Sequence, residues 1–145
     1  MSRFFATIVC LALASLIGVA HSGEKAAPKL DGKWVETGGT VDGKKVDEDI
    51  ISQRKFVFVF KNGKYTFSKG GKEFEAGTYK IDATKKPIAI DLNDNAGFEK
   101  SGEKLGVLKL DGDTLTLSFN IINGKKRPAN LKGGKDIGVT ILKRK

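Results

Sequence analysis

Two acidic residues, Glu73 and Glu75, are spaced so that they could act together in catalysis. Residues two apart on a β-strand project from the same face, and glycoside hydrolysis uses a pair of carboxyl groups as acid and as base or nucleophile. However, the two acids alternate with Phe74 and Ala76, which predicts that the apolar residues face the core and the acids face solvent. A carboxylate-based hydrolase is therefore only the second alternative function.

Other catalytic chemistry is restricted because the chain has one histidine, His21, and one cysteine, Cys10, both near the N-terminus. Removing that segment removes the usual general base, the thiolate nucleophile, and the imidazole and sulfur ligands of metal sites. The stretch Asp91–Gly97 is rich in oxygen ligands but places Ala96 where a calcium loop requires glycine. We therefore expect a protein that is not an enzyme and that holds no cofactor and no metal.

The first 22 residues have the pattern of a signal peptide. Arg3 provides the positive start, an uncharged apolar run extends from Phe4 to Ala20, and Ala20-His21-Ser22 suits cleavage after Ser22. Cleavage after Ala20 and retention as a membrane anchor are the alternatives, and the run is at the short limit for spanning a bilayer. The prediction is an exported protein, periplasmic or secreted, with no transmembrane span after signal removal.

Removal of residues 1–22 leaves 123 of the 145 residues, which suits one domain with a single core. We expect a flexible mature N-terminus over 23–29 and one domain over 30–145. The remaining chain has no cysteine and so no disulfides. Because Arg3 is the only charged residue lost, the net charge falls only from +9 to +8, and the domain is strongly basic.

Alternation of apolar and polar residues between glycine-bearing turns predicts an all-β domain. The clearest strand is 114–121, where Leu115, Leu117 and Phe119 share one face, and Asn62-Gly63 predicts a tight hairpin turn. A short helical turn is expected over 47–52. Strands joined in sequence by short turns favour a small antiparallel up-and-down barrel of about eight strands, with a two-sheet sandwich as the alternative.

Two details of this barrel depend on glycine and proline. A β-bulge near Gly77 would bring Phe74, Ala76, Tyr79 and Ile81 to the inner face of one strand. A ninth strand over 126–131 is an alternative, which Pro128 would confine to a sheet edge or a bulge.

Several motifs together resemble an uncharacterised lipocalin-like domain family abundant in planctomycete-type bacteria. They are Gly32-Lys33-Trp34, which is similar to the Gly-x-Trp start of lipocalins and related calycin barrels, Gly77-Thr78-Tyr79-Lys80-Ile81-Asp82, Leu110-Asp111-Gly112-Asp113, Arg127-Pro128, and the closing Ile141-Leu142-Lys143-Arg144-Lys145. The resemblance covers Lys29 to Lys145. It implies a lipocalin-like barrel in which Trp34 packs on a basic residue, either Arg127 or Arg144, and it implies no particular activity.

The lumen of such a barrel is the first candidate site. An eight-stranded barrel is either filled by its own side chains or holds one small ligand. The residues expected to line the lumen are Trp34, Phe58, Phe60, Tyr65, Phe67, Tyr79 and Phe119. Their size favours filling, while a pocket for a small apolar ligand stays open as the alternative.

A basic surface is the second candidate site, formed by Lys125, Lys126, Arg127, Lys132 and Lys135. Clustered positive charge can hold anionic envelope polymers or lipid headgroups through screened electrostatics. Aromatic residues that would stack on bases are missing from this segment, so no specific nucleic-acid partner is expected. The other interpretation is that these lysines serve only solubility.

Overall fold

The structure is a computed structural model that describes residues 26–96 and 102–145, so the predicted signal segment lies outside the described residues. Its first elements are β1 (Gly32–Val41), β2 (Lys44–Lys45), α1 (Glu48–Arg54), β3 (Val57–Lys61) and β4 (Lys64–Lys69). They are followed by β5 (Lys72–Asp82), β6 (Ile88–Ala96), β7 (Gly102–Asp111), β8 (Thr114–Asn120) and β9 (Ile137–Arg144).

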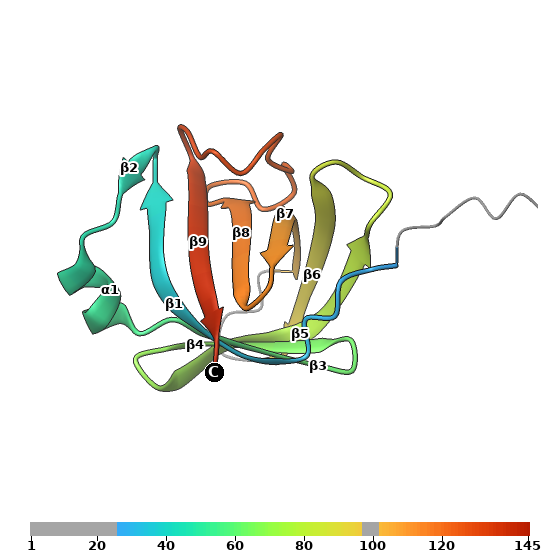
Figure 1. The fold of residues 1–145 in the computed structure, drawn as a ribbon, viewed down its shortest axis with the longest axis horizontal. Coiled ribbons are helices and arrows are strands. Elements are labelled where there is room, and N and C mark those ends of the chain that lie inside the picture. Colours follow the sequence, from blue (N-terminus) through green and yellow to red (C-terminus); the bar gives the residue numbers. More distant parts are fainter. Residues whose placement is uncertain (1–25, 97–101) are drawn as a thin grey trace, which may run out of the picture.

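The strands form a closed barrel (Figure 1). From β3 to β9 each strand pairs antiparallel with the next along the chain, and β1 pairs with both β3 and β9. This double pairing of β1 closes an eight-stranded barrel, to which the two-residue β2 adds a short hairpin at the end of β1. The predicted all-β, up-and-down barrel is confirmed.

Local turn chemistry sets the hairpins. Asn62 and Gly63 have φ values of 50° and 74°, as the predicted type I′ turn between β3 and β4 requires. The alternative strand at 126–131 does not form. Residues 121–136 instead connect β8 to β9 by turns and irregular chain, in which Pro128 is buried. A proline has no backbone N–H to donate to a sheet ladder, which is consistent with this outcome.

Helix α1 lies outside the barrel beside β1 (Figure 1). Its last residue, Arg54, donates a hydrogen bond of 2.8 Å from Nε to Glu36 Oε2, and Glu36 has a side chain only 1% exposed. The guanidinium carbon of Arg54 also lies 4.3 Å from the centroid of the Phe56 ring. The ladder between β1 and β3 ends at Val35, and this buried ion pair joins the helix to the next residue of β1.

One end of the barrel is closed by packed side chains. Leu30, Trp34, Leu115 and Leu142 are fully buried there, and Trp34 Nε1 donates a hydrogen bond of 2.7 Å to the carbonyl of Leu30. Arg144 lies over the Trp34 ring, which decides between the two basic partners that the resemblance implied.

A β-bulge in β5 changes which of its residues face inward. Phe67 pairs with Glu75 and Ser68 with Glu73, so Phe74 is an extra residue between them. Because neighbouring positions of β4 face opposite sides, Glu75 points inward with Phe67 whereas Glu73 points outward. The predicted common, solvent-facing side for Glu73 and Glu75 is therefore wrong.

The predicted bulge near Gly77 is present, but the extra residue belongs to β6. Ala76 pairs with Ala96 and Gly77 pairs with Asp94, so Asn95 is an extra residue of β6 in its ladder with β5. The inward positions of β5 are therefore those of Glu75, Tyr79 and Ile81 rather than that of Ala76, which pairs with the outward Thr66.

Candidate functional site

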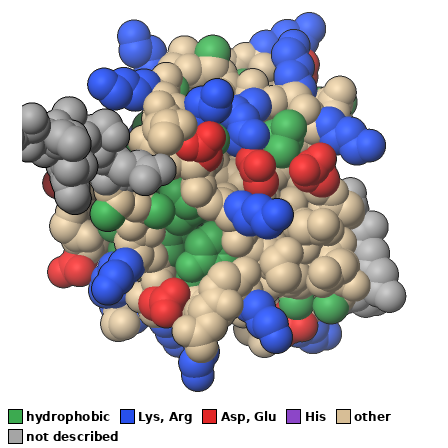
Figure 2. Space-filling model, turned by 90° about the vertical axis from the view of Figure 1, so that its right-hand side faces the viewer, with side chains coloured by type: hydrophobic (Ala, Val, Ile, Leu, Met, Phe, Trp, Pro, Cys, Tyr) green, Lys and Arg blue, Asp and Glu red, His purple; other side chains and the backbone are tan. Residues whose placement is uncertain are grey.

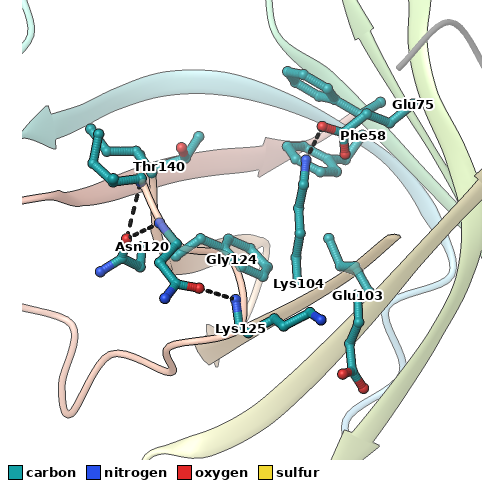
Figure 3. Close-up of a pocket in the computed structure, with 14 residues that line it drawn as sticks. Phe58, Glu75, Glu103, Lys104, Asn120, Gly124, Lys125 and Thr140 are labelled. Atoms are coloured by element: carbon teal, nitrogen blue, oxygen red, sulfur yellow. Dashed lines mark hydrogen bonds and ion pairs between the residues drawn. The ribbon is translucent and has the colours of Figure 1, made fainter. Parts of the chain in front are cut away.

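A pocket of about 610 Å³ opens at the end of the barrel opposite Trp34 (Figure 3). Its lining comes from β3 to β9 and from the start of the connection between β8 and β9. The pocket is thus the unfilled half of the lumen, and its mouth is bordered by residues 121–125.

One wall of the pocket is apolar. The rings of Phe58 and Phe67 lie against each other, with centroids 4.7 Å apart, and Leu92 and Phe119 complete the wall. Phe119 is placed by Gly106 on the neighbouring strand. A Cβ atom on Gly106 would lie 2.3 Å from Cε1 of the Phe119 ring, so the ring occupies the space that a side chain there would need.

The pocket also carries charge next to its apolar wall, because Glu75 pairs with Phe67 and Lys104 pairs with Leu92 on neighbouring strands. Lys104 on β7 reaches past β6 and forms an ion pair with Glu75 on β5 (Figure 3). The Glu75 side chain is 9% exposed and the Lys104 side chain 25% exposed, so the pair is largely shielded but accessible from the pocket. A ligand in the pocket would meet both partners of a partly desolvated ion pair.

Tyr65 supports the ion pair from the filled side of the lumen. Its hydroxyl donates a hydrogen bond of 3.4 Å to Glu75 Oε2. Burial raises the pKa of Tyr65 far above its ordinary value, and the negative charges of Glu75 and Asp94 raise it further. Tyr65 therefore stays protonated well into the alkaline range and remains a hydrogen-bond donor to the carboxylate.

The rim beside the pocket is a hydrogen-bonded turn that begins at Asn120. The side-chain oxygen of Asn120 accepts hydrogen bonds from the backbone N–H groups of Ile122, at 3.0 Å, and Asn123, at 2.6 Å. The carbonyl of Gly124 then accepts a hydrogen bond of 2.7 Å from the backbone of Leu105 on β7. These bonds fix the turn against the barrel.

All seven residues predicted to line the lumen lie in or against the hydrophobic core. Phe58, Phe67 and Phe119 line the pocket. Trp34, Phe60, Tyr65 and Tyr79 are not among its lining residues and instead pack the rest of the core. A lumen filled by side chains and a lumen with a pocket were alternative predictions. The barrel has both, because one half of its lumen is filled and the other half is a pocket.

The residues of the predicted basic surface are in different environments. Lys125 lines the mouth pocket, Lys126 and Lys135 are exposed, and Lys132 lies beside the outer faces of β1 and β9. Arg127 is held by the barrel wall. It donates hydrogen bonds to the carbonyl of Gly106, at 2.7 Å, and to Asp91 Oδ1, also at 2.7 Å.

Figure 2 shows that basic and acidic side chains are interspersed on one face of the molecule, around a patch of hydrophobic side chains. On this face the net positive charge of the chain is therefore not gathered into a patch of one sign.

Sequence reasoning missed four ionisable residues that are buried or line the lumen, namely Glu36, Glu75, Asp94 and Lys104. The signal for Lys104 was present, because it alternates with Gly106, Leu108 and Leu110, which face the lumen. Glu75 was missed because the bulge at Phe74 is set by pairing with β4. Contrary to expectation, the lumen is not lined by apolar and aromatic residues alone.

Within residues 26–96 and 102–145, no group of three or more His, Cys, Asp or Glu residues could hold a metal ion. No helix in the same ranges is long and apolar enough to cross a membrane.

Comparison with known proteins found no matching family model, no similar curated protein and no similar solved structure. The lipocalin-like resemblance of the sequence therefore stays a prediction. A barrel fold by itself does not assign a function, so the function has to follow from the pocket and the surface.

Proposed function

We propose that this protein binds a small amphipathic molecule in the mouth pocket and is not an enzyme. The observation that carries the proposal is a barrel that is packed at its Trp34 end and open at the other, where the pocket measures about 610 Å³. Pockets for small molecules typically measure roughly 300–1,000 Å³ and combine an apolar lining with a few polar groups. The apolar body of the ligand would lie against Phe58, Phe67 and Phe119.

The ion pair favours a neutral polar group on the ligand. An anionic group would compete with Glu75 for Lys104, and a cationic group would compete with Lys104 for Glu75. Either exchange leaves a partly buried charge without its partner, which is unfavourable. A hydroxyl or amide group can instead accept a hydrogen bond from Lys104 and donate one to Glu75 while the pair stays together.

The same contacts support binding rather than catalysis. Lys104 and Glu75 neutralise each other, and the raised pKa of Tyr65 makes its hydroxyl a weaker acid than an ordinary tyrosine. The predicted signal segment supports a location outside the cytoplasm, periplasmic or secreted. A ligand with a long apolar body would be protected from water there during transport or storage.

The test uses three ligands of equal chain length, decanol, decanoate and decylamine, measured by calorimetric titration. Decanol should bind most tightly. A Thr140→Phe variant fills the pocket and should abolish binding, whereas Thr116→Phe adds the same bulk next to β9 outside the pocket and should not. If none of the three ligands binds and native mass spectrometry of the purified protein shows no bound small molecule, the proposal is wrong.

A second candidate function is binding of anionic envelope polymers by the basic surface. It is supported by the exposure of Lys125, Lys126, Lys132 and Lys135. It is weakened by Arg127, whose guanidinium is already engaged by the barrel wall. Retention on heparin that falls steeply with salt, and that is lost when the four lysines are replaced by glutamine, would support it over lumen binding.

A further inference from the structure

Ile121 and Ile122 are adjacent in the sequence, and both expose their apolar side chains at the mouth of the barrel. Ile122 is 77% exposed and Ile121 is 49% exposed. Single exposed apolar residues are common on protein surfaces. An adjacent pair of isoleucines at the tip of a connection is less common, because it exposes to water an apolar area that polar residues could replace. Both residues also line the rim of the mouth pocket.

The exposure of these isoleucines is imposed by hydrogen bonds. The backbone N–H of Ile121 donates to the carbonyl of Asp136, at 2.9 Å, and that of Ile122 donates to the side chain of Asn120, at 3.0 Å. Asn120 is itself buried. The turn therefore holds the isoleucines in place on the outside of the mouth.

Basic residues follow the isoleucines within the same turn. Lys125 and Lys126 are both exposed, and their backbone N–H groups are bound by the side chain and the carbonyl of Asn123. Among the described residues that line the pocket, Glu103 is the acidic residue at the rim, and the chain as a whole carries a net charge of +9. An apolar tip next to lysines is the arrangement by which proteins bind the interface of an anionic bilayer.

A protein partner fits this surface less well. Specific protein interfaces bury roughly 1,200–2,000 Å² in total, far more than two isoleucine side chains can supply. A bilayer needs no matching shape, because the isoleucines enter the boundary between headgroups and acyl chains while the lysines stay among the anionic headgroups.

We propose that residues 121–126 dock the mouth of the barrel onto the surface of an anionic lipid bilayer. This goes beyond ligand binding, since docking needs only the isoleucine tip and its lysines and not an occupied pocket. Because the isoleucines border the pocket, docking would also turn the pocket mouth toward the lipid.

The experiment uses the processed protein, whose N-terminal residue is identified by mass spectrometry. It measures how much of this protein co-sediments with vesicles of phosphatidylcholine alone or of phosphatidylcholine mixed with phosphatidylglycerol. The wild-type protein should bind the mixed vesicles and bind less as salt is raised. The double variant Ile121→Ser, Ile122→Ser should bind about tenfold more weakly or worse, given the free energy of burying one aliphatic side chain. Lys125→Gln with Lys126→Gln should remove the preference for phosphatidylglycerol.

The matched control is Val59→Ser with Ile50→Ser, which removes two exposed apolar residues, one on the outer face of β3 and one on α1, that do not line the pocket, and it should leave vesicle binding unchanged. Unchanged fluorescence of Trp34, the only tryptophan of the chain, would show that each variant is folded. Vesicle binding that survives the isoleucine substitutions would overturn the proposal. The proposal would also be overturned if the wild-type protein bound no vesicles and instead formed a dimer, seen by sedimentation analysis, that the isoleucine substitutions dissociate. The tip would then pair with a second copy of the chain.

Discussion

Arg144 closes the packed end of the barrel by lying over the indole of Trp34, with its guanidinium carbon 4.3 Å from the ring centroid. The two residues pair directly across β1 and β9, the strands whose contact closes the barrel. Arg144 also donates a hydrogen bond to the carbonyl of Asp31, so that it joins the entry of β1 to the end of the chain. Closure of the barrel and burial of its tryptophan therefore depend on the same side chain.

Replacing Arg144 by alanine should lower the free energy of unfolding by about 1–3 kcal/mol, because a cation–π contact, a hydrogen bond and the packing of the aliphatic stem are lost together. Urea unfolding followed by Trp34 fluorescence measures the change. Lys143→Ala, on the exposed neighbouring position of β9, should change stability by no more than about 0.5 kcal/mol. Equal effects of the two substitutions would contradict the closing role of Arg144.

The Lys104–Glu75 pair should show strong coupling in a double-mutant cycle with Lys104→Met and Glu75→Gln. Each single substitution leaves a charge in the lumen without its ion partner and should cost about 1–3 kcal/mol of stability. The double variant should be more stable than the sum of the two single effects predicts, by roughly 0.5–3 kcal/mol. Additive effects, measured by urea unfolding at neutral pH, would show that the two charges do not interact in solution.

The raised pKa of Tyr65 predicts a loss of stability at alkaline pH. The folded state keeps the Tyr65 proton while the unfolded chain releases it near pH 10, so the stabilisation is full below about pH 10 and decreases above it. This residue should contribute a fall of about 1.4 kcal/mol per pH unit above pH 10. Comparing unfolding of the wild type with Tyr65→Phe between pH 9 and 11 isolates the effect, since the two proteins differ only in this hydroxyl.

The control for this titration is Tyr79, the other tyrosine of the chain. Its pKa is also raised, first by burial and then by Asp31, but it is only half-buried. Tyr79→Phe should therefore change the alkaline slope less than Tyr65→Phe does. The reverse order would show that Tyr79, and not Tyr65, is the tyrosine held protonated by its surroundings.

Arg127 should matter for structure rather than for binding anions. Its hydrogen bonds to the carbonyl of Gly106 and to Asp91 attach the connection between β8 and β9 to β6 and β7. Arg127→Ala should make residues 121–136 exchange their amide hydrogens faster and should lower stability by about 1–3 kcal/mol. Lys126→Ala, at the adjacent exposed position, should do neither. Normal exchange in Arg127→Ala would return this residue to the candidate anionic-polymer surface.

Much of the fold could be predicted because its signals are local. The alternation of Leu115, Leu117 and Phe119 requires one buried face, and Asn62-Gly63 requires a tight turn at that point of the chain. Such patterns repeat from strand to strand and lead directly to an antiparallel barrel. The aromatic residues of the lumen were found in the same way, because inward positions on a strand recur every second residue.

The polar half of the lumen could not be predicted in the same way. One extra residue, Phe74, shifts the alternation of β5 and turns Glu75 inward toward Lys104 on β7. Nothing within β5 marks the bulge, because it is defined by the pairing with β4. Likewise, Arg127 and Arg144 were equivalent partners for Trp34 until the pairing of β1 with β9 brought Arg144 across from the tryptophan.

The sequence by itself determined an all-β chain, its tight turns and the aromatic character of its core, because each of these is set by neighbours along the chain. Only the tertiary structure decided that half of the lumen is filled and half is a pocket, and that an ion pair lies inside it. Closure of the barrel and the register of its bulges bring together residues 29 positions apart in the chain, as in Glu75 and Lys104. Such pairings depend on the whole sheet, and no local pattern encodes them.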